Sequence, residues 1–159
     1  MDKFTPRRPM RRKPTSTLAG SPTGVVAVAK KAPPLAPGNI RIIPLGGVEE
    51  IGKNCTAIEI GQDIIVIDIG LAFPTDQTPG VDYIIPDVTY LEENKNRIRG
   101  VIITHGHLDH TGGIPFVMSR IGNPPLYTRN LTSLFIKKRM DEFPHLPPLN
   151  MIVVENDSR

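Results

Sequence analysis

The chain has 159 residues, which is enough for one ordinary domain with a hydrophobic core and too few for two full ones. Its 39% hydrophobic and 22% charged residues are typical of a globular protein, and no stretch approaches the roughly 18 apolar residues of a membrane-spanning helix. The single cysteine, Cys55, excludes an internal disulfide and a zinc cluster made of cysteines. We therefore expect a cytoplasmic location and no membrane partner.

Charge divides the chain near Asn39. Residues 1–38 hold eight Lys or Arg against Asp2 alone, a net charge of +7, whereas residues 39–159 hold 11 basic and 15 acidic side chains, a net charge of −4. With seven prolines as well, the first segment cannot bury enough apolar surface to offset its ordering entropy. The sequence predicts a disordered basic tail at 1–38, which either binds phosphates or only aids solubility, and a domain at 39–159.

The domain begins with strand patterns. Apolar residues at 40–45 are followed by a Gly-Gly turn, and 55–60 alternates in the manner of a half-buried strand. Residues 64–69 are apolar on both faces except for Asp68, which is typical of a central strand that is covered on both sides. A short turn at 61–63 separates the last two segments, so we predict that they form a hairpin.

The rest of the domain alternates between strand and helix patterns. Prolines and scattered acids favour a long ordered loop at 73–90, and a short buried strand is predicted at 101–104. Apolar residues at helical spacing predict a helix over 114–121 that a glycine stops. A second helix is expected over 131–143. A further strand is expected at 151–154. The fold class is α/β.

Four potential metal ligands follow the strand at 101–104, namely His105, His107, Asp109 and His110. In a locally extended stretch, the i, i+2 spacing points His105 and His107 the same way, so both imidazoles can bind one ion. Asp109 and His110 begin the next turn and can face a second ion, since two-metal hydrolytic sites hold their ions about 3.5 to 4 Å apart. Imidazole and carboxylate ligands favour zinc or manganese.

Two other side chains have less specific patterns. Asp68 is a carboxylate in an apolar strand, where an unpaired charge is costly, so it needs a partner. That partner is either a ligand histidine, which Asp68 would orient, or a backbone amide or lysine in a purely structural role. His145, between Pro144 and Leu146, is interpreted as a loop residue. Gly106, Gly112 and Gly113 allow close approach of the backbone.

The chain resembles a known family in four segments, which are IRIIPLGGVEEIGKN at 40–54, IIVIDIGLAFP at 64–74, GVDYIIPDVTYL at 80–91 and VIITHGHLDHTGGIPF at 101–116. The HxHxDH pattern resembles the motif of the metallo-β-lactamase superfamily. That motif alone leaves lactamases, thioesterases and nucleases open. The first and third segments narrow the resemblance to the ribonuclease J family of its β-CASP branch.

The resemblance implies an αββα sandwich, of which 39–159 would be an incomplete N-terminal part because the family's remaining ligands would lie beyond residue 159. It also implies that His105 and His107 bind one divalent ion, that Asp109 and His110 bind the other, and that Asp109 takes part in catalysis. Asp68 matches a supporting acidic residue of the family. RNA is the implied substrate, in RNA processing and decay, and a homo-oligomer is compatible with the family.

The sequence therefore predicts part of a metal-dependent ribonuclease with weak or no activity by itself, because four ligands leave each ion two protein donors instead of three. Two alternatives stay open. The chain could be a non-catalytic fragment that binds RNA through its tail, or a metallo-hydrolase acting on small molecules. Exonuclease or endonuclease preference is not defined by the sequence.

Overall fold

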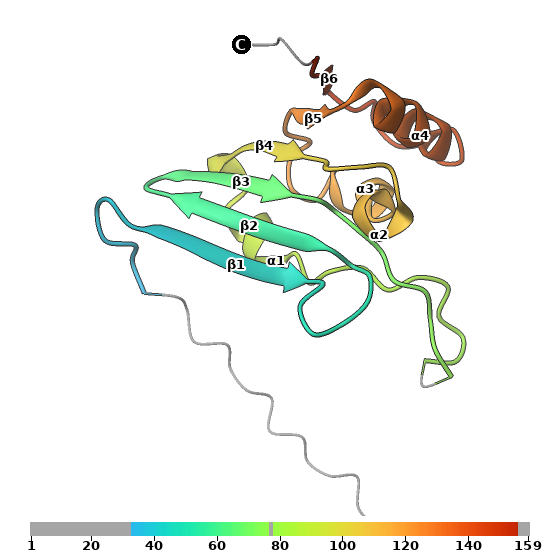
Figure 1. Cartoon of the computed structure of the whole chain (residues 1–159), viewed down its shortest axis with the longest axis horizontal. Helices are drawn as coiled ribbons and strands as arrows, with labels where there is room; N and C mark the ends of the chain where they lie inside the picture. Colours follow the sequence, from blue (N-terminus) through green and yellow to red (C-terminus); the bar gives the residue numbers. More distant parts are fainter. Residues whose placement is uncertain (1–32, 77, 156–159) are drawn as a thin grey trace, which may run out of the picture. The chain divides into compact units, whose positions relative to one another are not determined.

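The structure, a computed structural model, describes residues 33–76 and 78–155 (Figure 1). In these residues six strands form one mixed sheet in which the spatial order is the chain order. The strands are β1 (Ile40–Gly46), β2 (Cys55–Ile60), β3 (Asp63–Ile67), β4 (Ile98–Ile102), β5 (Leu126–Thr128) and β6 (Met151–Val153). The helices are α1 (Thr89–Glu93), the 3-10 helix η1 (Lys95–Arg97), α2 (Leu108–Thr111), α3 (Ile114–Val117) and α4 (Asn130–Met140).

The sheet changes from antiparallel to parallel pairing at β3. Strands β1, β2 and β3 form an antiparallel meander, in which Ile58 lies opposite Ile42 on one side and Ile65 on the other. Strands β3 to β6 pair in parallel. Parallel neighbours end at the same edge of the sheet, so the residues that follow β3 and β4 meet there.

One face of the sheet holds the core. Ala57 of β2, Val66 of β3 and Val101 of β4 are fully buried and pack in one cluster with residues of the helices, namely Leu91, Ile114, Val117 and Ile136. On the other face apolar side chains are exposed, namely those of Ile40, Ile42, Ile60 and Ile102. The described residues are thus one sheet with its helices on one face, the α and β layers of half an αββα sandwich.

A buried carboxylate on the core side of β2 holds the antiparallel end of the sheet together. Glu59 is 3% exposed, and its Oε2 lies 2.7 Å from Nη1 of Arg41 and accepts a hydrogen bond of 3.0 Å from the hydroxyl of Tyr90. Its Oε1 forms an ion pair with Arg97 of η1. Burial alone raises the pKa of Glu59, but Arg97, Tyr90 and Arg41 together hold it below its ordinary value.

Several sequence predictions are confirmed. The hairpin of β2 and β3 is present, and the apolar set Ile114, Val117, Met118 and Ile121 is buried as one face. Only the first turn, α3, is regular α-helix; the chain continues in hydrogen-bonded turns to Gly122, where φ is 87°. That left-handed conformation ends a helix at little cost only at glycine, as the sequence predicted.

Other boundaries were wrong. The strand predicted at 64–69 ends at Ile67, because Asp68 has a φ of 61°, and only one face of β3 is fully buried. The strand predicted at 101–104 is β4, shifted three residues earlier at its start. The helix predicted to reach Phe143 ends at Met140 with shorter i to i+3 bonds, because Pro144 disfavours helical geometry in the residue before it.

The loop predicted at 73–90 ends where α1 begins at Thr89, and the strand β5 was not predicted. The tail predicted at 1–38 lies mostly outside the described residues, and 33–38 contain neither helix nor strand. Within the described ranges, no helix has the length and apolar character needed to cross a membrane.

Candidate metal centre

The four predicted ligands lie on the loop from β4 into α2, at the edge where β3 also ends. Backbone amides from two other segments fix this loop: Leu71 donates to the carbonyl of Leu108, Asn54 to that of Asp109 and Ile69 to that of His110, at 2.9–3.1 Å. These amides lie in the segments that follow β1 and β3. The turn that carries Asp109 and His110 is therefore held by main-chain hydrogen bonds to the carbonyls of residues 108, 109 and 110.

Such close backbone packing requires glycine. A Cβ on Gly70 would overlap the carbonyl oxygen of Asp109, and one on Gly113 would lie 2.5 Å from the carbonyl oxygen of Gly70. A Cβ on Gly106 would lie 2.5 Å from the ring of Phe135, and one on Gly112 would overlap Leu71. The predicted role of glycines 106, 112 and 113 in close approach is confirmed.

Three imidazoles gather on the loop. The ring centroids of His105 and His107 are 4.7 Å apart, as the i, i+2 spacing predicts, and those of His105 and His110 are 4.0 Å apart. Asp109 joins them, because its Oδ2 lies 3.3 Å from Nε2 of His110. The structure thus brings all four predicted side chains together, with His105 between the other two histidines. His145 lies in an exposed turn, as predicted.

Asp68 is the buried anchor of this cluster. It is 5% exposed, and its Oδ2 lies 2.8 Å from Nδ1 of His110. Its Oδ1 also accepts a hydrogen bond of 2.8 Å from the backbone amide of Thr104. A carboxylate next to Nδ1 favours the proton on that nitrogen, which leaves the lone pair of His110 on Nε2. Both partner types considered for Asp68 are therefore present.

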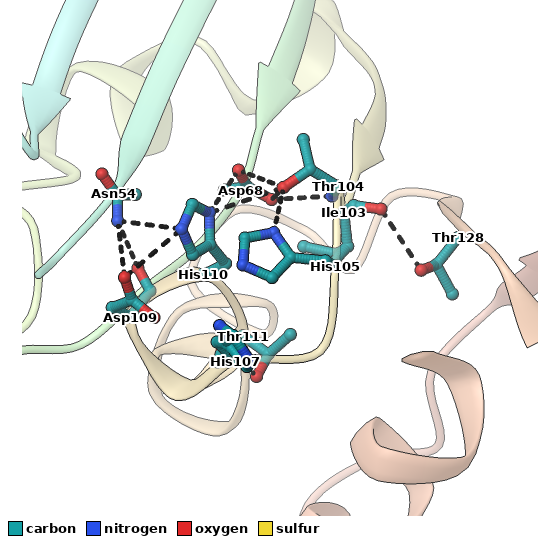
Figure 2. A network of polar contacts seen from close by, with 10 residues as sticks. All are labelled: Asn54, Asp68, Ile103, Thr104, His105, His107, Asp109, His110, Thr111 and Thr128. Atoms are coloured by element: carbon teal, nitrogen blue, oxygen red, sulfur yellow. Dashed lines mark hydrogen bonds and ion pairs between the residues drawn. The ribbon is translucent and has the colours of Figure 1, made fainter. Parts of the chain in front are cut away.

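Thr104 extends the network to a second histidine (Figure 2). Its hydroxyl lies 3.0 and 2.9 Å from the two oxygens of Asp68 and 3.0 Å from Nδ1 of His105. Because the carboxylate only accepts, the hydroxyl donates to Asp68 and accepts from Nδ1–H of His105. His105 then also has its lone pair on Nε2. One buried carboxylate orients both rings.

Asn54 contacts the cluster from the other side. Its Nδ2 donates to the carbonyl oxygen of Asp109 at 3.1 Å and to Oδ2 of the same residue at 3.3 Å, and it lies 3.2 Å from Nε2 of His110. Figure 2 shows it facing His110 opposite Asp68. Sequence reasoning missed both Asn54 and Thr104. Their only signal was position, at the end of the segment 40–54 and directly before the HxHxDH pattern.

With this geometry in view, comparison with known proteins identifies the chain's relatives. Residues 48–157 match the family model described as the metallo-beta-lactamase superfamily. The chain belongs to this superfamily. The match agrees with the fold described above, which is one sheet with its helices on one face, and with the HxHxDH pattern at 105–110.

The predicted resemblance to ribonuclease J is also confirmed. The chain is 41% identical to ribonuclease J of Synechocystis over 72% of its length, and 42% identical to ribonuclease J 1 of Streptococcus pyogenes over 68%. It is 41% identical to ribonuclease J of Thermus thermophilus over 76%. These alignments cover 18%, 19% and 22% of the relatives, so the chain spans about a fifth of their length.

The superfamily implies divalent metal ions, and the donor set fits them. His105 and His110 have their Nδ1 atoms engaged by Thr104 and Asp68, which leaves the lone pair of each ring on Nε2, and Asp109 adds a carboxylate that is 44% exposed. Within residues 33–76 and 78–155, however, no three His, Cys, Asp or Glu side chains are placed to hold one ion together. The described residues therefore provide at most a partial donor set for a divalent ion.

Cys55 does not extend that set. The thiol is buried at the start of β2, and burial, followed by the negative charge of Asp68, raises its pKa to about 12. A thiol must lose its proton to become a metal ligand or a nucleophile. Cys55 therefore belongs to the core, and the candidate ligands of this centre are imidazoles and a carboxylate.

Proposed function

We propose that this chain supplies part of the active site of a metal-dependent ribonuclease. His105 and His107 bind one divalent ion, and Asp109 and His110 bind a second, with zinc as the first choice and manganese as the alternative. The observation that carries this proposal is the network in which Asp68 orients His110 directly and His105 through Thr104. The same carboxylate leaves the lone pair of both imidazoles on Nε2, the atom that would coordinate a metal ion.

Each residue of the cluster has a distinct task in this proposal. Asp68 fixes the tautomer of His110 and increases its basicity, which strengthens it as a ligand. Asn54 holds the carboxylate of Asp109 beside His110. Asp109 is the most exposed of the acidic groups in the cluster and faces incoming substrate, so we assign it to catalysis as well as to metal binding. Bound divalent ions supply Lewis acidity and stabilise negative charge at a phosphodiester.

RNA is proposed as the substrate because the relatives at about 40% identity are named ribonuclease J. We expect little hydrolysis by the chain alone, since two protein donors per ion are fewer than the three of most catalytic zinc sites. The tail is proposed to add affinity for phosphates through its net charge of +7. Cytoplasmic location and a homo-oligomer are proposed with the same function.

A chimera tests the proposal. Residues 40–155 would replace the aligned segment of Thermus thermophilus ribonuclease J, and cleavage of single-stranded RNA would be measured with and without a chelator. We expect chelator-sensitive cleavage by the chimera and none when His107→Ala is added. A folded chimera that hydrolyses lactams or thioesters and leaves RNA intact would favour a small-molecule hydrolase instead.

A second candidate function, non-catalytic RNA binding, is favoured by the charge of residues 1–38. Deleting these residues separates it from the first. If RNA affinity and its dependence on salt disappear with the tail while metal binding is unchanged, RNA binding is independent of the metal centre. If affinity persists and requires the metal ions, the centre itself contacts RNA.

A further inference from the structure

Phe135 of α4 lies directly on the loop between the candidate ligands His105 and His107. An ideal Cβ built on Gly106 would be 2.5 Å from Cδ2 of the Phe135 ring and 3.2 Å from Cε2. The ring therefore occupies the space that a side chain at 106 would need. No ligand role accounts for this contact, because a phenyl ring neither coordinates metal ions nor forms ordinary hydrogen bonds.

Phe135 is largely exposed in spite of this contact. Phe135 is 53% exposed, and it shares the outward face of α4 with the exposed residues Leu131 and Leu134. The buried face of the same helix contains Thr132 and Ser133 beside Ile136. This arrangement reverses the usual amphipathic pattern, in which the apolar side chains of a surface helix face the core. An aromatic ring is thus exposed next to the metal loop.

The charge around the ring is positive. Residues 129–140 contain four basic side chains and no acidic one. Arg129, Lys137 and Lys138 are exposed, and Lys138 lies three positions after Phe135, which places the two on neighbouring parts of the helix surface. Arg139 is paired with Glu142 and is less available. A flat apolar ring with surrounding cations complements a base joined to phosphates.

We propose that Phe135 is a stacking platform for one base of single-stranded RNA beside the candidate metal loop. The inference rests on the proposed ribonuclease function and adds a binding subsite to it. The edge of the ring packs on Gly106, and an exposed face receives the base, so the nucleotide is held next to His105 and His107. Because every base has a π-face, the subsite is tolerant of sequence.

Matched RNA substrates separate stacking from charge. The full chain would be titrated with a short single-stranded RNA and with an abasic oligonucleotide of the same length, so that the phosphate contribution of the tail is equal in both. The difference in affinity measures the contribution of bases. We expect Phe135→Leu to reduce affinity for the ordinary RNA by about tenfold and to leave the abasic affinity unchanged, whereas Phe135→Tyr keeps both.

Leucine is the informative substitution because it still covers Gly106 without a flat ring. Phe73→Leu, the same change at another exposed phenylalanine, is the matched control. Zinc affinity is measured in every variant. The proposal is overturned if Phe135→Leu alters base-dependent affinity no more than Phe73→Leu does, or if its only effect is loss of zinc affinity, which would make Phe135 a support for the loop alone.

Photocrosslinking gives a direct readout of position. The chain has five Phe, three Tyr and no Trp, so an adduct of RNA containing 5-iodouridine can be assigned by peptide mapping. We expect an adduct on Phe135, and adducts confined to other residues would contradict the stack. A chimera that cleaves RNA normally with Phe135→Leu would remove this inference and leave the ribonuclease proposal intact. If Phe135 crosslinks and base-dependent affinity depends on it, but the chimera is inactive, the stacking inference stands and the ribonuclease proposal does not.

Discussion

Two buried carboxylates stand at opposite ends of β3 and have different partners. Glu59 lies opposite Ile64, near the start of the strand, and pairs with the guanidinium groups of Arg41 and Arg97. Asp68 follows the end of the strand and accepts hydrogen bonds from a backbone amide, a hydroxyl and an imidazole. Their exposed fractions are 3% and 5%, so burial does not distinguish them.

The partners do distinguish them. Two permanent cations offset the negative charge of Glu59, so this carboxylate needs no further partner and its role is structural. The partners of Asp68 are neutral groups, or an imidazole that is charged only when protonated, and through them Asp68 orients His105 and His110. A buried negative charge that is compensated only by hydrogen bonds gains further stabilisation when a metal ion binds beyond the imidazoles. We therefore expect the Glu59 cluster to contribute mainly to stability and the Asp68 cluster mainly to metal binding.

The largest expected effect is on stability at the Glu59 end. Glu59→Gln should lower the free energy of unfolding by about 3 kcal/mol, because it removes the buried carboxylate with which Arg41 and Arg97 form ion pairs. Asp63→Asn, at the exposed ion pair with Arg99, should change it by no more than about 0.5 kcal/mol. Urea denaturation measures both. Equal changes in the free energy of unfolding for the two variants would contradict the larger contribution given to the buried cluster.

The next effect is on metal binding at the Asp68 end. Asp68→Asn should lower zinc affinity by about 10- to 100-fold, since the amide no longer holds the proton of His110 on Nδ1 and the ring in its orientation. Glu59→Gln should leave zinc affinity unchanged under conditions where it is folded. Calorimetric titration of both variants compares the two ends directly. Similar zinc affinities for Asp68→Asn and the unaltered chain would contradict the role given to Asp68.

A smaller effect is expected from the link between Asp68 and His105. Thr104→Val keeps the shape of the side chain but removes the hydroxyl, so His105 loses its orienting partner and zinc affinity should fall by up to about tenfold. Thr104→Ser keeps the hydroxyl and is the matched control. If valine and serine give the same zinc affinity, the hydroxyl does not connect the carboxylate to His105.

The smallest effect is the response to acid. The pKa of Glu59 is lowered in the folded state, so its stabilising effect is fully present above its ordinary value of 4.5 and is lost as the pH falls through the lowered value. The unaltered chain should therefore lose more thermal stability than Glu59→Gln between about pH 6 and about pH 3. The melting temperatures of the two proteins at both pH values provide the measurement. A parallel decline would contradict the prediction.

The site was more predictable from the sequence than the boundaries of the elements. The spacing of His105, His107, Asp109 and His110 is local, so it determined which side chains could meet. Asp68 could be selected because a charge in an apolar strand requires a partner. By contrast, Asn54 is 55 residues from Asp109, and only the long-range backbone bonds of residues 54 and 69–71 bring it there.

The buried cluster of Glu59 was also invisible in the sequence. Alternation placed Glu59 on the same side of β2 as Cys55 and Ala57, but its neutralisation depends on Arg41 from another strand and on Arg97, 38 residues away. A helix was predicted over 131–143, where α4 lies, whereas the exposure of Phe135 was not predicted, because its outward apolar face reverses the expected pattern. Tertiary contacts determined these features.

Titration of the chain with zinc tests the central claim most directly, because the four histidines include their own control. We predict that His105→Ala and His110→Ala each lower zinc affinity by at least about tenfold, whereas His145→Ala, in the exposed turn, leaves it unchanged. Equal zinc affinities for all three variants and the unaltered chain would show that the loop following β4 is not a metal centre.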